Sequence, residues 1–199
     1  MGMSFSLHHT NCCMRAKLLF QTPSRRRLGR DDFTEETEKT QWKHWLDELP
    51  KLEEVTVDCC LKLKEFVEVK ETQLHLFSDA SREGYASVAY HCLKDTSNWT
   101  HCAFVMGKAR LVLLCEISIP RLEITVVVIS VRFSKVMREE LDMIIRHVCY
   151  WTDSMSVLKC IKNESKRFHT FASNHLMVIW NGSSLSEWHY INRDDNSAD

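Results

Sequence analysis

The segment LHLFSDASREGYASVAYHCLK, residues 74–94, contains two stretches in which apolar side chains alternate with other residues, separated by a short polar turn. We expect strands at 74–79 and 85–93, because a period of two is typical of strands with one buried face. A third strand is expected at 101–107, after the turn-forming sequence DTSN at 95–98. Three consecutive strands joined by short turns predict an antiparallel meander.

Downstream of the meander, apolar residues recur at helical spacing from Pro120 to residue 145, and a proline is well placed in the first turn of a helix. The β-branched run TVVVISV at 125–131 opposes a helix by propensity, but the length and periodicity of the pattern favour one. The remaining elements are expected in the order strand, helix, helix, strand, at 147–152, 155–163, 168–181 and 186–192. This order predicts an α/β domain with a mixed sheet.

Upstream of the meander, the sequence predicts an appendage. Residues 1–33 show no clear periodicity, and we interpret their arginine-rich part at 25–30 as a solvated arm rather than a phosphate-binding patch. A helix is expected at 34–50, where Thr34 is suited to capping its start and Pro50 to ending it. One face of this helix carries an apolar stripe that includes two tryptophans, and we expect the stripe to pack against other parts of the protein.

The composition limits the kinds of partner and compartment. The 199 residues carry a net charge of −1, whereas proteins that grip nucleic acid through its phosphates usually have a basic excess. Nucleic-acid affinity would therefore come from a neighbouring domain or from local basic clusters. The number of cysteines is odd, nine, which favours reduced intracellular thiols over a secreted disulfide framework. No signal peptide or membrane-spanning run is evident, so we expect a cytoplasmic location without a membrane partner.

Carboxylates follow the predicted strands at positions that could bring them together. Asp79 ends the first strand and Asp153 follows the fourth, and adjacent parallel strands would place both at one sheet edge. Glu123 lies near the start of the long helix, and Asp199 follows the last strand. Clustered carboxylates repel one another unless a cation neutralises them, and Mg²⁺ prefers such oxygen ligands. Spacing alone is weak evidence, because 27 acidic residues produce many accidental sets of this kind.

The sequence around these carboxylates resembles the ribonuclease H domain of BEL/Pao-type retrotransposon polyproteins. Four blocks carry the resemblance in the same order as in that family, and each contains one of the carboxylates. They are residues 74–94, GKARLVLLCEISIPRLEI at 107–124, WTDSMSVLKCIKN at 151–163 and SEWHYINRDDNSAD at 186–199. Upstream, residues 16–55 resemble the segment that links the reverse transcriptase to the ribonuclease H. The resemblance therefore covers roughly residues 14–199.

The resemblance implies a ribonuclease H-like fold, with a five-stranded mixed sheet flanked by helices and a helical N-terminal appendage. We accordingly divide the chain into two parts. Residues 1–72 form the N-terminal arm and connection-like segment, with a disordered start and a helix at about 34–49. Residues 73–199 form the ribonuclease H-like domain.

The resemblance also implies a site and an activity. Asp79, Glu123, Asp153 and Asp199 would be catalytic ligands of two Mg²⁺ ions, with Mn²⁺ as a substitute. The reaction would be hydrolysis of the RNA strand of RNA–DNA hybrids. The partners would be the hybrid and the reverse transcriptase domain of the parent polyprotein. Three residues that border the carboxylates are further candidates for nucleic-acid contact: Ser81, Gly84 and Ser154.

The chain departs from the family pattern at its end, which leaves alternative functions open. The last block reads NSAD where the family usually has NPAD, and in the family a further helix follows. The domain is therefore expected to be truncated before its last helix, with Asp199 poorly supported. The alternative to an active ribonuclease H is an inactive retrotransposon remnant that keeps the fold and binds nucleic acid or protein. An interaction module that uses the Trp42 and Trp45 stripe would require that stripe to be exposed.

Overall fold

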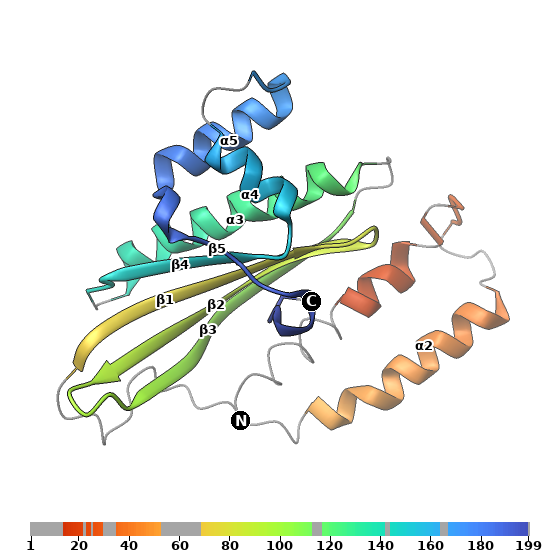
Figure 1. Ribbon diagram of the computed structural model, residues 1–199. Helices are drawn as coiled ribbons and strands as arrows, with labels where there is room; N and C mark the ends of the chain where they lie inside the picture. The colour runs from red at the N-terminus through yellow and green to blue at the C-terminus, as the bar shows by residue number, and fades with distance from the viewer. Residues whose placement is uncertain are drawn as a thin grey trace.

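A five-stranded mixed sheet forms the centre of the computed structural model, in the order β3-β2-β1-β4-β5 (Figure 1). The structure describes residues 14–21, 23–24, 26–29, 35–52, 69–112, 117–141, 144–163 and 167–198. The strands are β1 (Val69–Ala80), β2 (Gly84–Asp95), β3 (Thr100–Leu111), β4 (His147–Thr152) and β5 (Trp188–Tyr190). β1, β2 and β3 pair antiparallel, and β4 is parallel to both β1 and β5. The predicted meander and mixed sheet are confirmed.

The first three strands extend beyond their predicted limits. Backbone pairing of β1 with β2 continues from Ala80↔Tyr85 out to Val69↔Asp95, past the apolar positions that mark the buried part of each strand. Side-chain alternation identifies only residues with a buried face, so it misses the polar ends of a long hairpin. β5 is shorter than predicted, because residues Leu185–Glu187 form a 3₁₀ turn stabilised by a capping box between Ser184 and Glu187.

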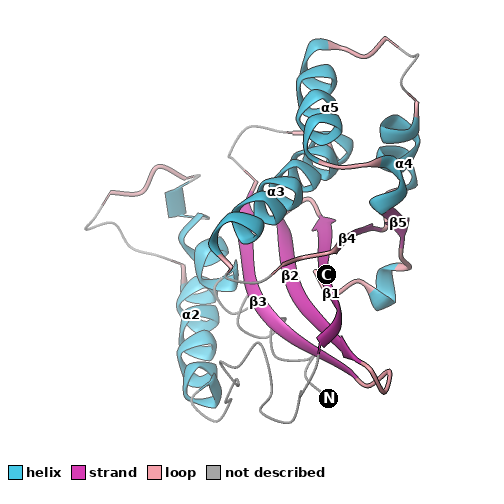
Figure 2. Ribbon diagram, turned by 90° about the vertical axis from the view of Figure 1, so that its left-hand side faces the viewer, coloured by secondary structure: helices cyan, strands magenta, loops and turns pink. Residues whose placement is uncertain are grey.

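Three helices cover one face of the sheet (Figures 1 and 2). They are α3 (Ile119–Glu140), α4 (Met155–Lys162) and α5 (Thr170–Gly182). The β-branched run in α3 is helical because its valines are needed in the core, where Val127 is fully buried and Val126 is 1% exposed. The helix ends before its predicted limit, and Ile144, which continues the helical spacing, is 82% exposed. No helix in these described ranges is apolar and long enough to span a membrane.

Polar contacts fix α3 on the sheet in addition to its apolar packing. The buried hydroxyls of Ser130 on α3 and Ser87 on β2 lie 2.8 Å apart. Ser134 on α3 contacts the Tyr150 hydroxyl on β4 at 2.5 Å, and burial raises the pKa of Tyr150 to about 12. Buried hydroxyls are costly without partners, so these pairs specify how the helix is rotated on the sheet.

The opposite face of the sheet carries an aromatic cluster. Leu76 and Phe77 are neighbours on β1, so their side chains point to opposite faces of the sheet. Leu76 belongs to the core under α3, whereas Phe77 packs with Tyr90 and Trp151 on the other face. The Trp151 indole Nε1–H donates to Nδ1 of His75 at 3.1 Å. Both faces of the sheet therefore contribute to packing, although the helices lie on one side only.

The N-terminal appendage contains a helical segment at 14–21 and helix α2 (Glu36–Glu48), followed by a 3₁₀ turn, Leu49–Leu52, that includes Pro50. The cap of α2 is Glu35, which forms a capping box with Glu38, whereas the predicted cap Thr34 lies outside the described residues. Arg26 forms ion pairs with both of these glutamates at the start of α2 and is itself exposed.

The tryptophan stripe of α2 packs within the appendage. The Trp42 ring lies 5.1 Å from the ring of Phe20 and 4.9 Å from that of Trp45, measured between centroids. Both tryptophans are half-buried. No residue of α2 is buried, and Leu46 of the same stripe is 43% exposed, so the stripe is only partly covered and the interaction-module hypothesis stays a prediction.

One cysteine pair contradicts the prediction of reduced thiols. Cys92 on β2 and Cys102 on β3 are register partners with Cα atoms 4.1 Å apart, and their sulfurs form a disulfide. Sequence spacing gave no signal for this pair, because the hairpin register rather than a repeated spacing brings the two residues together. Cys149 and Cys160 are free thiols, and the other five cysteines lie outside the described residues.

Candidate carboxylate site

Two of the predicted site residues lie at the carboxyl ends of neighbouring parallel strands. The last register pair between β1 and β4 is Ser78↔Thr152. Asp79 therefore comes directly after this pair on β1, and Asp153 comes directly after it on β4. Both aspartates are half-buried. The carboxyl ends of parallel strands are where α/β sheets bind ligands, and the structure places these two carboxylates at one such end, as predicted.

Glu123 reaches the same region from the first turns of α3. Its Oε2 accepts a hydrogen bond from the Ser154 hydroxyl at 2.8 Å, and the Ser156 hydroxyl lies 3.4 Å from the same oxygen. Ser154 directly follows Asp153 and caps α4, where its Oγ accepts the Val157 backbone N–H at 3.2 Å. The contact therefore joins the start of α3 to the junction between β4 and α4.

The chain that leads to Asp199 lies against the same sheet end, although Asp199 itself falls outside the described residues. The buried Asn196 donates from Nδ2 to the Ser78 carbonyl oxygen at 3.1 Å, and its Oδ1 accepts the Ala198 N–H at 3.2 Å. Sequence reasoning missed Asn196 as an anchor. The only signal was its place in the NSAD block, and a side-chain bond to a strand carbonyl has no sequence pattern of its own.

All of the predicted ligands are carboxylates, which is the type of ligand that a hard divalent cation such as Mg²⁺ prefers. Their grouping is incomplete. Among the residues that the structure describes, no set of three or more His, Cys, Asp or Glu side chains could hold a metal ion. Asp79, Glu123 and Asp153 therefore do not form a three-ligand centre by themselves in this structure, and Asp199 lies outside the described residues.

Two of the predicted nucleic-acid contacts shape the turn that follows Asp79. The Ser81 hydroxyl accepts the Gly84 N–H at 3.3 Å, and the Ser81 backbone N–H donates to the Gly84 carbonyl at 2.8 Å. A Cβ atom on Gly84 would lie 2.8 Å from the Arg110 carbonyl oxygen, so the close approach of β3 requires glycine there. These contacts explain the turn without any ligand.

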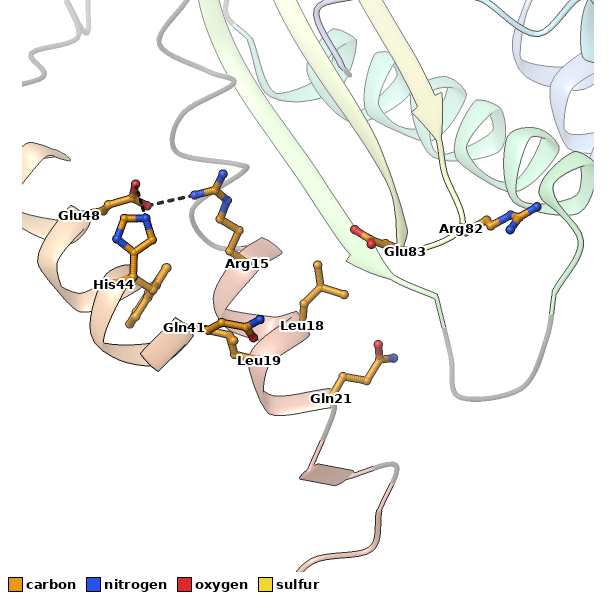
Figure 3. A pocket seen from close by; sticks show the side chains of 10 residues that line it. Arg15, Leu18, Leu19, Gln21, Gln41, His44, Glu48, Arg82 and Glu83 are labelled. Carbon is orange, nitrogen blue, oxygen red and sulfur yellow. Dashed lines mark hydrogen bonds and ion pairs between the residues drawn. The ribbon is translucent and has the colours of Figure 1, made fainter. Parts of the chain in front are cut away.

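A cavity of about 560 Å³ separates the appendage from this turn (Figure 3). Arg82 and Glu83 of the turn line one side, and the helical segment 14–21 and α2 line the other. On the α2 side, Arg15 forms an ion pair with Glu48 at 3.0 Å. Charges of both signs thus border the cavity, and they do not favour one class of ligand.

Comparison with known proteins gives one family match and several structural matches. The family model described as Pao retrotransposon-like RNaseH-like domain matches residues 8–154, which spans the predicted boundary between appendage and domain. A search of curated proteins gave no match.

Several of the structural matches are ribonuclease H proteins of low sequence identity. The N-terminal RNase H domain of a Mycobacterium tuberculosis protein is 10% identical, with a TM-score of 0.44, and the match covers 64% of this chain and 87% of that one. RNase H1 from the halophilic archaeon Halobacterium salinarum is 9% identical, with a TM-score of 0.40 and coverage of 64% and 90%. LC11-RNase H1 in complex with an RNA/DNA hybrid is 8% identical, with a TM-score of 0.40 and coverage of 63% and 88%.

Proposed function

Because the chain belongs to the Pao retrotransposon-like RNaseH-like domain family, we propose that it is a retroelement ribonuclease H that hydrolyses the RNA strand of RNA–DNA hybrids. The observation that carries the proposal is the arrangement at the carboxyl ends of β1 and β4. Asp79 and Asp153 follow the last register pair there, and Ser154 binds Glu123 beside them.

The proposed ligands of two Mg²⁺ ions are Asp79, Glu123, Asp153 and Asp199. When bound, such ions activate a water and stabilise the leaving oxygen of a phosphodiester. The contribution of the chain is to hold these carboxylates near one another despite their mutual repulsion. Asn196 would direct the last residues, and with them Asp199, toward the end of β1.

Substrate recognition is the second part of the proposal. Contacts to the 2′-hydroxyls in the minor groove of the hybrid would select RNA. The turn that contains Ser81 and Gly84 directly follows Asp79, and we propose that it lies beside the substrate. The net charge of −1 means that phosphate affinity would come mainly from the reverse transcriptase of the parent polyprotein.

The test is cleavage of a labelled RNA–DNA hybrid by the purified chain with Mg²⁺ or Mn²⁺. Asp79→Asn keeps the side-chain shape but removes the charge, and it should lower the cleavage rate by more than about a hundredfold. Asp47→Asn is the matched control, because Asp47 is an exposed residue on α2. Equal loss in both variants, or cleavage that survives in Asp79→Asn, would reject Asp79 as a ligand.

A second candidate function follows from the last block, which reads NSAD where the family usually has NPAD. An inactive remnant would keep the fold and bind the hybrid without cutting it. The remnant would be supported if the chain binds the hybrid but does not cleave it with either Mg²⁺ or Mn²⁺. Cooperative unfolding of the same sample would show that the chain is folded.

A further inference from the structure

The hydroxyl of Ser154 is fully used within the protein. A serine hydroxyl has one proton to donate and two lone pairs to accept with. Ser154 donates its proton to Glu123 Oε2 at 2.8 Å and accepts the Val157 N–H at 3.2 Å. Its second lone pair is within reach of the Ser156 hydroxyl, at 2.9 Å. Ser154 is also only 5% exposed, so it has neither the hydrogen-bonding capacity nor the access to contact nucleic acid as predicted.

The same bonds orient the two oxygens of Glu123 differently. Oε2 is directed at the hydroxyls of Ser154 and Ser156. Oε1 accepts no hydrogen bond from the part of the chain described. A carboxylate fixed through one oxygen presents the other in a defined direction, and bonds of this kind commonly orient metal ligands.

We propose that Ser154 is a positioning residue, which holds Glu123 through Oε2 so that Oε1 is presented to a divalent cation. The inference rests on the proposed function, because it takes Glu123 to be a metal ligand. Ser156 supports the arrangement, because its hydroxyl lies 2.9 Å from the Ser154 hydroxyl and 3.4 Å from Glu123 Oε2. Ser154, which follows Asp153 and caps α4, thereby links the start of α4 to Glu123 on α3 by a hydrogen bond.

A competing role for Ser154 is only to cap α4, and glycine separates the two roles. Glycine at a helix N-cap is nearly as favourable as serine, whereas alanine is poor, and neither can donate to Glu123. Threonine retains the hydroxyl and the cap. The experiment measures Mn²⁺ affinity of the full chain by titration calorimetry for Ser154→Ala, Ser154→Gly and Ser154→Thr, with thermal unfolding of each variant.

A positioning role predicts that Ser154→Ala and Ser154→Gly both weaken Mn²⁺ binding by about tenfold, although only Ser154→Ala loses much stability. Ser154→Thr should restore the affinity. Adding Ser154→Ala to Glu123→Gln should produce little further loss of Mn²⁺ affinity, because Ser154 acts on the cation only through the Glu123 carboxylate.

Three outcomes overturn the inference. Wild-type affinity in Ser154→Gly would show that Ser154 acts only as a cap. Wild-type affinity in Glu123→Gln would show that Glu123 is not a ligand. If the wild-type chain itself binds no Mn²⁺, the proposed two-metal function fails, and the positioning role fails with it. If the wild type binds Mn²⁺ and the Ser154 variants bind it equally well, only the positioning role fails.

Discussion

At the scale of single residues, His91 is an unusual member of the core. Its side chain is fully buried on β2, and neither ring nitrogen has a hydrogen-bond partner among the residues that the structure describes. Burial, and to a smaller extent the neighbouring His101, lowers the pKa of His91 below the ordinary value of 6.5. Burial therefore favours the neutral imidazole in the folded protein, and the hydrogen-bonding groups of the ring remain unsatisfied within the described part of the chain.

This predicts that His91→Leu stabilises the protein, most of all in acid. Near neutral pH the gain should be on the order of 1 kcal/mol, from removing unsatisfied polar atoms. The unfolded chain binds the proton first, because its histidine pKa is higher. Wild-type stability should therefore fall as the pH decreases below about 6.5, and the fall should be smaller in His91→Leu. Urea unfolding at several pH values measures this, with the exposed His169→Gln as control. An unchanged pH slope in His91→Leu would contradict the prediction.

At the scale of elements, the disulfide between Cys92 and Cys102 locks the β2–β3 hairpin, which forms one edge of the sheet. A cross-link over a sequence separation of 10 residues should contribute roughly 2–3 kcal/mol to the free energy of unfolding. A reductant should lower the urea midpoint of the wild type accordingly. The double variant Cys92→Ala/Cys102→Ala should unfold at the reduced midpoint with or without reductant. Equal stability of the wild type in both conditions would show that the bond does not form in solution.

Helix α3 shows how far local patterns predict an element. Periodicity correctly predicted a helix against the propensity of its valines, because burial outweighs a few tenths of a kcal/mol per residue. Its end was predicted too late, since sequence spacing could not tell that Ile144 is exposed. The strand at 147–152 was predicted to the residue, whereas the polar ends of β1 and β2 were missed because pairing, not alternation, defines them.

The same helix offers a matched pair of substitutions. Val127 is fully buried and Val136 is 48% exposed. Both Val→Ala changes improve helix propensity, but only Val127→Ala leaves a cavity. We expect Val127→Ala to destabilise the protein by about 2–3 kcal/mol and Val136→Ala to be neutral or stabilising by up to about 0.5 kcal/mol. Chemical denaturation measures both. If Val127→Ala were as stable as the wild type, packing would not be what keeps this run helical.

At the scale of the whole molecule, the candidate site joins segments that are far apart in the sequence. The adjacency of Asp79 and Asp153 was predictable, because strand order and direction determine which strand ends meet. The roles of Ser154 and Asn196 were not, because each depends on a side-chain bond to another element: Ser154 to Glu123 on α3, and Asn196 to the Ser78 carbonyl on β1. Patterns along a chain predict where elements begin and pair, but not such contacts.

Asn196 should therefore matter both for stability and for cleavage. Asn196→Ala removes the hydrogen bond to the Ser78 carbonyl oxygen, which should cost about 1 kcal/mol of unfolding free energy. If Asp199 is a ligand, the loosened segment would also misplace it, and cleavage should fall by more than about tenfold under conditions where the variant remains folded. Asn192→Ala is the matched control, because Asn192 is exposed in the same segment. Its side chain makes no capping hydrogen bond to the 3₁₀ turn Arg193–Asp195. Cleavage by Asn196→Ala at the rate of Asn192→Ala would mean that the last residues are held by other contacts, or that Asp199 takes no part in the reaction.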